Sequence, residues 1–177
     1  MKWSFLNILN DALLPASLMI VSKFIGVFVV VLLFNLDWSL EEYSNQIFAF
    51  GTTKSVDDAI IITSYSDLFM YLVMVLFLSF SIIRAVFFHS THINPEIFYK
   101  LTLNNLSDLV KNSFVIYKSA TIWLIFTIFA NLVILANSVL GKSFAWIGLL
   151  TASITISLAV ILASDVSREI KSQKNIK

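Results

Sequence analysis

Apolar residues occur in four long runs along the chain, and shorter polar segments separate them. A helix that crosses the hydrocarbon core of a bilayer, about 30 Å thick, needs roughly 17–25 mostly apolar residues. Four segments meet this requirement, and we expect membrane-spanning helices at 18–36, 67–88, 119–140 and 144–164. The pattern therefore predicts an all-α integral membrane protein with four transmembrane helices, built as a single membrane domain over 1–177.

The first span is less regular than the others because it contains Lys23. If the helix began at Phe24, only the 13 residues to Leu36 would remain, which is too short a stretch to cross the bilayer. We therefore place Lys23 inside the span, with its ammonium group reaching toward the nearer membrane face. No Ala-x-Ala cleavage pattern follows, so we expect this span to be kept as an anchor.

Three segments outside the spans have apolar residues at helical spacing on one side and polar residues on the other. They are 2–14, 39–50 in the outer segment, and 95–117. Pro15 follows the first of them, and the helix-start signal Asn94-Pro95 stands at the beginning of the last. We interpret them as amphipathic helices that lie on the membrane surface. The last of them is expected to break near Asn104-Asn105.

The end of the outer segment 37–66 is compatible with two structures. The β-branched residues Ile60–Thr63 favour a short strand, whereas Ser55 placed three residues before Asp58 resembles a helix start. A strand edge beside lipid would need a partner for its backbone groups, and no second strand is evident. We favour a helix over 55–66 and keep the strand as the alternative.

Lys and Arg are unevenly distributed among the loops, and this asymmetry predicts the orientation of the chain. With the N-terminus in the cytoplasm, ten cationic residues lie on or near the cytoplasmic side, and only Lys54 and Lys142 lie outside. We therefore expect both termini in the cytoplasm, a basic cytoplasmic tail at 165–177, and a multi-pass protein of a bacterial plasma (inner) membrane.

The composition agrees with a membrane protein and excludes several functions. The chain is 58% hydrophobic and 13% charged, whereas soluble domains carry about 25% charged residues. The net charge of +1 gives no field for nucleic acid. Because there is no cysteine, disulfides, thiolate metal sites and thiol redox chemistry are excluded. We expect no cofactor, and as partners the lipid bilayer together with another membrane protein or a second copy of the chain.

Small residues form a stripe at spacings of three and four along the fourth span. Gly148, Ala152, Thr155 and Ala159 are its central members, with Ala145 and Ala163 at its ends. Such stripes let helices approach closely in lipid, and we expect the third span to pack here. Polar residues of the third span, above all Asn131 and Asn137, would then bond to Ser153, Thr155 or Ser157.

Lys23 and Arg84 are the charges that we place inside the hydrocarbon, both toward its cytoplasmic side. Arg84 fits a basic anchor at the membrane interface. For Lys23 we expect a carboxylate partner, Asp11 or Asp165 by depth, or a lipid phosphate that bridges Lys23 and Arg84. No acidic residue is predicted near the middle of a span, which disfavours proton-coupled or cation-coupled transport.

Sequence motifs for catalysis are missing, so we predict no catalytic residues and no enzyme. His89, His92 and Glu96 have ligand-like spacing, but Asn94-Pro95 interrupts the helix that would align them, and we predict no metal site. The leading hypothesis is a non-catalytic accessory, assembly or scaffold subunit that acts through helix contacts. The alternatives are a small oligomeric channel or permease with a path near Asn131 and Asn137, and a lipid-modifying enzyme using the two histidines and Glu96.

Overall fold

The computed structural model describes residues 5–36, 55–87, 95–104 and 113–175. These residues form five helices and no strand: α1 (Phe5–Phe34), α2 (Val56–Phe87), α3 (Pro95–Leu103), α4 (Ser113–Val139) and α5 (Ala145–Asn175). All except α3 are long and apolar enough to cross a membrane. The predicted fold class is thus confirmed: the chain is an all-α, multi-pass membrane protein.

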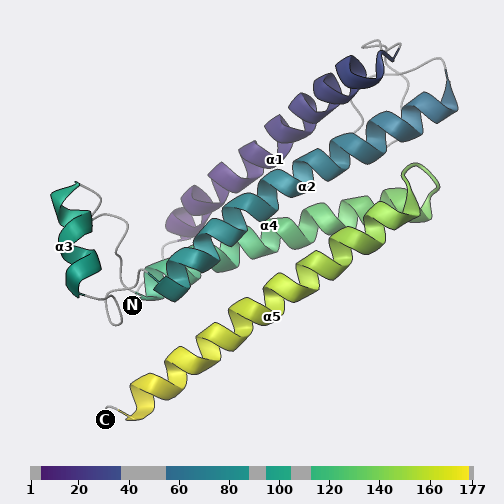
Figure 1. The fold of residues 1–177 in the computed structure, drawn as a ribbon. Helices are drawn as coiled ribbons and strands as arrows, with labels where there is room; N and C mark the ends of the chain where they lie inside the picture. Colours follow the sequence, from purple (N-terminus) through teal and green to yellow (C-terminus); the bar gives the residue numbers. More distant parts are fainter. Residues whose placement is uncertain (1–4, 37–54, 88–94, 105–112, 176–177) are drawn as a thin grey trace.

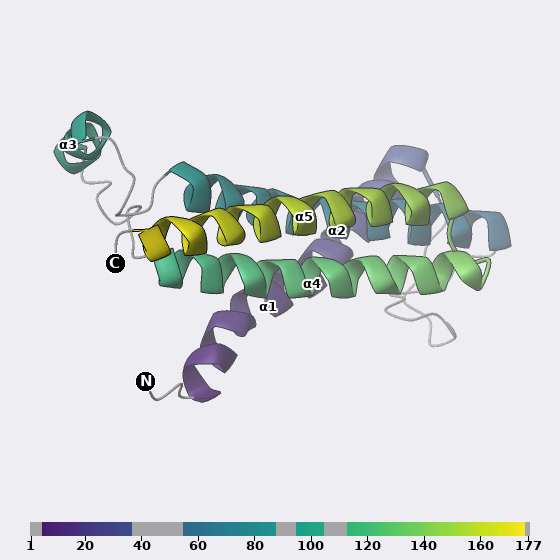
Figure 2. The same cartoon turned by 90° about the horizontal axis from the view of Figure 1, so that it is seen from below.

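The four long helices form one bundle in which α2 and α4 are central (Figures 1 and 2). Helix α1 packs against α2 and α4, and α5 packs against α4 and α2. The start of α1 and the end of α5 lie at one end of the bundle, which we call the termini end, and the α4–α5 turn lies at the other, the hairpin end (Figure 1). The short helix α3 lies beside the termini end, apart from the long helices.

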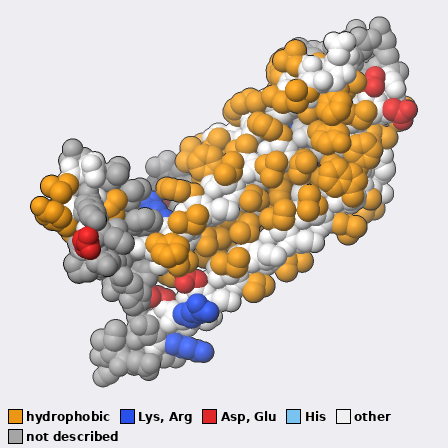
Figure 3. All heavy atoms as spheres, in the orientation of Figure 1, with side chains coloured by type: hydrophobic (Ala, Val, Ile, Leu, Met, Phe, Trp, Pro, Cys, Tyr) orange, Lys and Arg blue, Asp and Glu red, His pale blue; other side chains and the backbone are white. Residues whose placement is uncertain are grey.

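The interior of the bundle is filled by large side chains from α2, α4 and α5. Tyr71, Met74, Leu78, Ile134 and Ile147 are fully buried there. At the edge of this core Phe77 stacks on Trp123, with ring centroids 4.9 Å apart. The outer surface is also largely apolar (Figure 3). Since a bilayer solvates apolar side chains, this outer surface is what a membrane-spanning bundle requires.

The first two long helices extend further than the sequence indicates. Helix α1 passes through Pro15 without interruption, so residues 5–14, the described part of the separate helix expected at 2–14, are continuous with the first span. Helix α2 begins at Val56, so residues 56–66 are helical, as favoured, and continuous with the second span, which was placed at 67–88. A helix satisfies its own backbone groups in lipid, which favours continuing it over breaking it.

The remaining boundaries differ from the predictions in a similar way. Helix α3 ends at Leu103, next to the expected break, but α4 already begins at Ser113, inside the segment 95–117 that was assigned to the membrane surface. Helix α5 continues to Asn175, through most of the predicted tail. The interfacial helix expected at 39–50 lies outside the described residues.

The turn between α4 and α5 has the hydrogen bonds of a Schellman motif. Gly141 has a φ of 70°, which a glycine adopts without strain. The amide of Lys142 donates to the carbonyl of Asn137 at 2.8 Å, and the amide of Gly141 donates to that of Ser138 at 3.1 Å. The hydroxyl of Ser64 on α2 accepts a bond from the amide of Phe144 at 2.9 Å. These contacts hold the end of α4, and with it Asn137, against α2.

Candidate functional site

The bundle encloses an ion pair between two of its membrane-spanning helices. Lys23 on α1 and Asp67 on α2 are joined by a distance of 2.6 Å between Nζ and Oδ1. Their side chains are 3% and 0% exposed. Lys23 is the thirteenth of the 24 residues in the apolar stretch Asp11–Phe34 and therefore lies near the middle of this candidate span. We call Lys23, Ser66, Asp67 and Asn137 the buried charge cluster.

The ammonium group of Lys23 has three acceptors on α2. Besides Asp67 it donates to the hydroxyl of Ser66 at 2.7 Å and, more weakly, to the carbonyl of Thr63 at 3.5 Å. Ser66 in turn donates to the same carbonyl at 3.2 Å. An ammonium carries three donors, so each of them is used. Every one of these acceptors comes from a single turn of α2, and the contacts therefore fix the register of α1 against α2.

Asn137 connects α4 to the other oxygen of the carboxylate. Its amide nitrogen donates to Oδ2 of Asp67 at 2.9 Å. The amide oxygen of Asn137 is the only buried side-chain polar atom among the described residues that lacks a hydrogen-bond partner. The cluster thus joins three helices, balances one positive charge with one negative charge, and keeps one unused acceptor.

A glycine allows the close approach of α1 and α2 at this level. A Cβ placed on Gly26 would lie 3.0 Å from the carbonyl oxygen and 3.1 Å from the Cα of Ser66. Both are backbone atoms that cannot rotate away. Small residues at helix contacts in lipid permit such short separations. Gly26 lies one helical turn after Lys23, so the close contact and the ion pair reinforce each other.

The partners expected for Lys23 are corrected by the structure. Asp11 instead pairs with Lys118, at 2.5 Å, and Asp165 accepts a bond from the hydroxyl of Tyr117 at 2.7 Å. Asp67 had been assigned to the start of the second span, whereas it is the twelfth residue of α2. The expectation that no acidic residue lies near the middle of a span is therefore wrong.

A single lipid phosphate does not bridge Lys23 and Arg84. Arg84 follows Asp67 by 17 residues on α2, which corresponds to about 26 Å along a helix. It lies in the last turn of α2, at the termini end, and lines a cavity together with Asp11 and Lys118. The two cations that were grouped by sequence therefore belong to different places in the bundle.

A second polar network connects α2, α4 and α5 and includes Asn131. Thr151 on α5 donates to the Oδ1 atom of Asn131 on α4 at 2.9 Å. The hydroxyl of Tyr71 on α2 lies 2.8 Å from both the carbonyl of Thr151 and the hydroxyl of Thr155. Asn131 is thus bonded to α5 as expected, but through Thr151, one turn before Thr155.

The small-residue stripe lies along one side of the buried face of α5. Gly148 and Thr155 are buried, and Ala152 and Ala159 are partly buried. A Cβ on Gly148 would lie 2.9 Å from the hydroxyl oxygen of Ser138, so α4 is the helix that this glycine contacts. Ser153 and Ser157, named as partners for the asparagines, are exposed and bond to carbonyls of their own helix.

The described residues contain no group of three or more His, Asp or Glu side chains placed to hold a metal ion. Glu96 lies in the first turn of α3. His89 and His92 lie outside the described residues, so the structure does not place the histidine site considered for a lipid-modifying enzyme.

With the architecture and the cluster described, the chain belongs to the class of four-span, all-α membrane proteins. Comparison with protein-family models, with curated proteins and with solved structures gives no match.

Proposed function

We propose that the protein is a non-catalytic accessory, assembly or scaffold subunit of a bacterial plasma membrane, with both termini in the cytoplasm. The orientation and the membrane rest on the uneven distribution of Lys and Arg among the loops. The role in assembly rests on the outer face of α5, the face that points away from α4 and α2.

Three serines lie along the centre of that outer face. Ser153, Ser157 and Ser164 are separated by four and seven residues and are all exposed, and spacings of this kind place side chains on one line of a helix. The hydroxyls of Ser153 and Ser157 bond to carbonyls of α5 itself, which leaves a narrow surface suited to another helix. Lipid-facing residues need no small side chains, whereas helix contacts in membranes favour them.

The interior of the bundle supports the same role. The ion pair between Lys23 and Asp67 connects α1 to α2, and the Thr151–Asn131 bond connects α4 to α5. Buried polar contacts of this kind hold helices in a defined register. A bundle locked internally in this way presents a fixed outer surface, which is what a scaffold needs.

Cysteine cross-linking in native membranes tests the proposal, because the chain has no cysteine of its own. Single cysteines at positions 153, 157 and 164 should form cross-links to a second copy or to another membrane protein. Leu132→Cys is the matched control, since Leu132 is 56% exposed on the outer surface of α4 and lies outside the proposed contact face. If no α5 position cross-links above the level of Leu132→Cys, the proposed contact surface is wrong.

The buried charge cluster favours a second candidate, a small oligomeric channel or permease. Ionisable residues inside a membrane often mark the route of an ion or a proton. The path suggested near Asn137 leads to Asp67, and the unused amide oxygen of Asn137 is an acceptor in that place. The assay is solute or proton flux into vesicles that contain the purified protein. Flux that is lost in Asp67→Asn while the α-helical signal remains would favour this candidate over the scaffold.

A further inference from the structure

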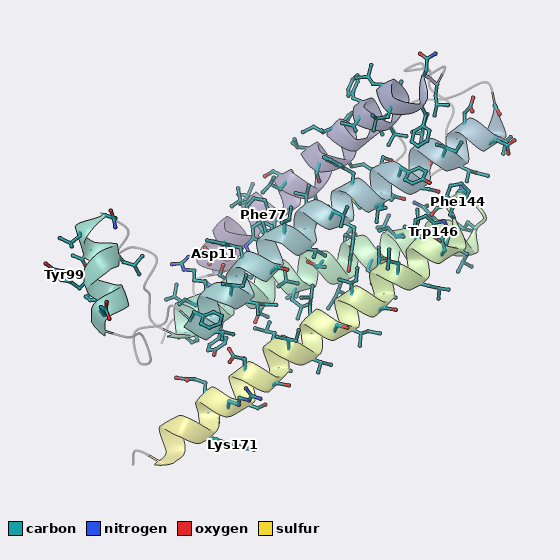
Figure 4. The ribbon with its side chains drawn as sticks, viewed as in Figure 1. Asp11, Phe77, Tyr99, Phe144, Trp146 and Lys171 are labelled. Atoms are coloured by element: carbon teal, nitrogen blue, oxygen red, sulfur yellow. The ribbon has the colours of Figure 1, made fainter. Side chains whose placement is uncertain are left out.

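A cavity of about 420 Å³ lies at the termini end of the bundle, far from the buried charge cluster. It is bounded by the first turns of α4, the last turns of α2 and the segment of α1 around Pro15. Its volume falls within the range of small-molecule sites in proteins, about 300–1,000 Å³. Figure 4 labels Asp11, one of the residues that line it, at this end of the bundle.

The charged residues of the lining give it a positive balance. Arg84 and Lys118 contribute two cations and Asp11 contributes one carboxylate, which leaves a formal charge of +1. Two hydroxyls, those of Ser81 and Ser119, face the same space. Guanidinium, ammonium and hydroxyl groups are all hydrogen-bond donors, and a phosphate is the common ligand that accepts from all of them.

The apolar side chains around the cavity favour a phosphate that belongs to a lipid over a phosphate free in water. Leu14, Phe114 and Val115 line the cavity and are also exposed on the outer surface of the bundle. An apolar rim of this kind is unfavourable around a hydrated ion but is suited to the acyl chains of a phospholipid. Basic pockets between transmembrane helices near a membrane surface bind anionic lipid headgroups.

We propose that this cavity binds the phosphodiester of an anionic membrane phospholipid, with Arg84 and Lys118 as the cationic ligands. The single negative charge of such a headgroup matches the +1 of the lining. The Lys118–Asp11 ion pair, 2.5 Å long, then orients the ammonium at the edge of the site. Acyl chains lie along the apolar rim, so the lipid seals the space between α1, α2 and α4.

The test is binding of added lipid to the full-length protein in a neutral detergent, followed by native mass spectrometry. The probes are phosphatidylglycerol, phosphatidylcholine and inorganic phosphate. Wild-type protein should retain phosphatidylglycerol, and Arg84→Gln should bind it about fivefold more weakly, the effect of one basic residue near a membrane surface. Lys171→Gln, on the exposed part of α5, is the control with the same change of charge and should bind like wild type.

Two further variants keep the test informative if Arg84→Gln does not fold. Asp11→Asn removes the only carboxylate of the lining and should bind phosphatidylglycerol at least as tightly as wild type. Ser119→Leu changes no charge, lies at an exposed position and fills the cavity, so it should abolish retention. Equal loss in Ser119→Leu and Lys171→Gln would contradict the site.

The three probes distinguish the sources of the phosphate. Retention of phosphatidylglycerol but not phosphatidylcholine supports the proposal. Equal retention of both lipids would refute the matching of charge, and displacement of phosphatidylglycerol by inorganic phosphate at the same concentration would show that the cavity takes a free anion and overturn the lipid assignment.

Discussion

Removing the carboxylate of Asp67 is the perturbation that tests the buried charge cluster most directly. In Asp67→Leu, Lys23 would keep its ammonium in a place that is only 3% exposed, with the Ser66 hydroxyl and one long contact to a carbonyl as its remaining acceptors. Breaking a buried ion pair by removing one partner costs about 3–5 kcal/mol, because the other charge stays buried without compensation. We expect a loss of stability of this size, about half of what a typical domain has.

The double variant Lys23→Met with Asp67→Leu distinguishes the effect of the charges on stability from the effect of side-chain packing. Both charges are then replaced by apolar side chains of similar volume, and such replacements are often neutral or stabilising. The double variant still leaves the buried amide nitrogen of Asn137 without its acceptor, which costs about 1–3 kcal/mol. We expect the double variant to be more stable than Asp67→Leu alone, so that the two changes are strongly non-additive. Asp11→Asn is the matched control at the partly exposed pair with Lys118, where the loss should stay below about 1 kcal/mol.

The measurement is reversible unfolding in mixed detergent micelles, followed by the α-helical circular dichroism signal, for wild type, both single variants and the double variant. A loss of stability in Asp67→Leu no larger than that in Asp11→Asn would contradict the cost of an uncompensated buried ammonium. A double variant that loses as much stability as the two single variants together would show that Lys23 and Asp67 are not coupled.

Three further predictions concern other parts of the bundle. Gly26→Leu should destabilise the fold by about 1–3 kcal/mol, since the new side chain meets the backbone of α2 at about 3 Å; a stability equal to wild type would contradict the close approach. Thr151→Val removes the hydroxyl that bonds Asn131 and should lower the free energy of unfolding by about 0.6–2 kcal/mol in the same assay. An unchanged stability would contradict a contribution of this hydrogen bond. For orientation, Val56→Cys should react with a membrane-impermeant maleimide in intact cells and Ile170→Cys only after permeabilisation; the reverse pattern would invert the proposed topology.

The number of spans was predictable because long apolar runs leave the chain no alternative to helices in lipid. Their ends were not, and Asp67 shows why. A charge at the edge of an apolar run is normally taken as the end of the span, and here Lys23 neutralises it, so that the helix continues through it from Val56. A lone Lys in one span is a reason to search the edges of the other spans for its carboxylate.

The polar contacts of the core illustrate a second limit. The sequence identified Asn131 as a polar group at membrane depth, and α5 as the helix that would bond to it. The partner is Thr151, not Thr155, because the rotation of α5 about its axis depends on how large residues such as Ile147 pack. The spacing of residues along one helix shows which of them share a face. Which face meets a particular neighbouring helix depends on how the large side chains pack.

The ion pair between α1 and α2 also bears on how the protein enters the membrane during synthesis. The sequence separation of 44 residues means that α1 is complete before Asp67 has been made. Alone in lipid, α1 would carry an uncompensated ammonium at a cost of at least about 2.5 kcal/mol. Lateral release from the translocation channel is therefore more favourable for α1 and α2 together, as a hairpin, than for α1 by itself. The growing chain has a segment that is stable in lipid only after α2 has been made.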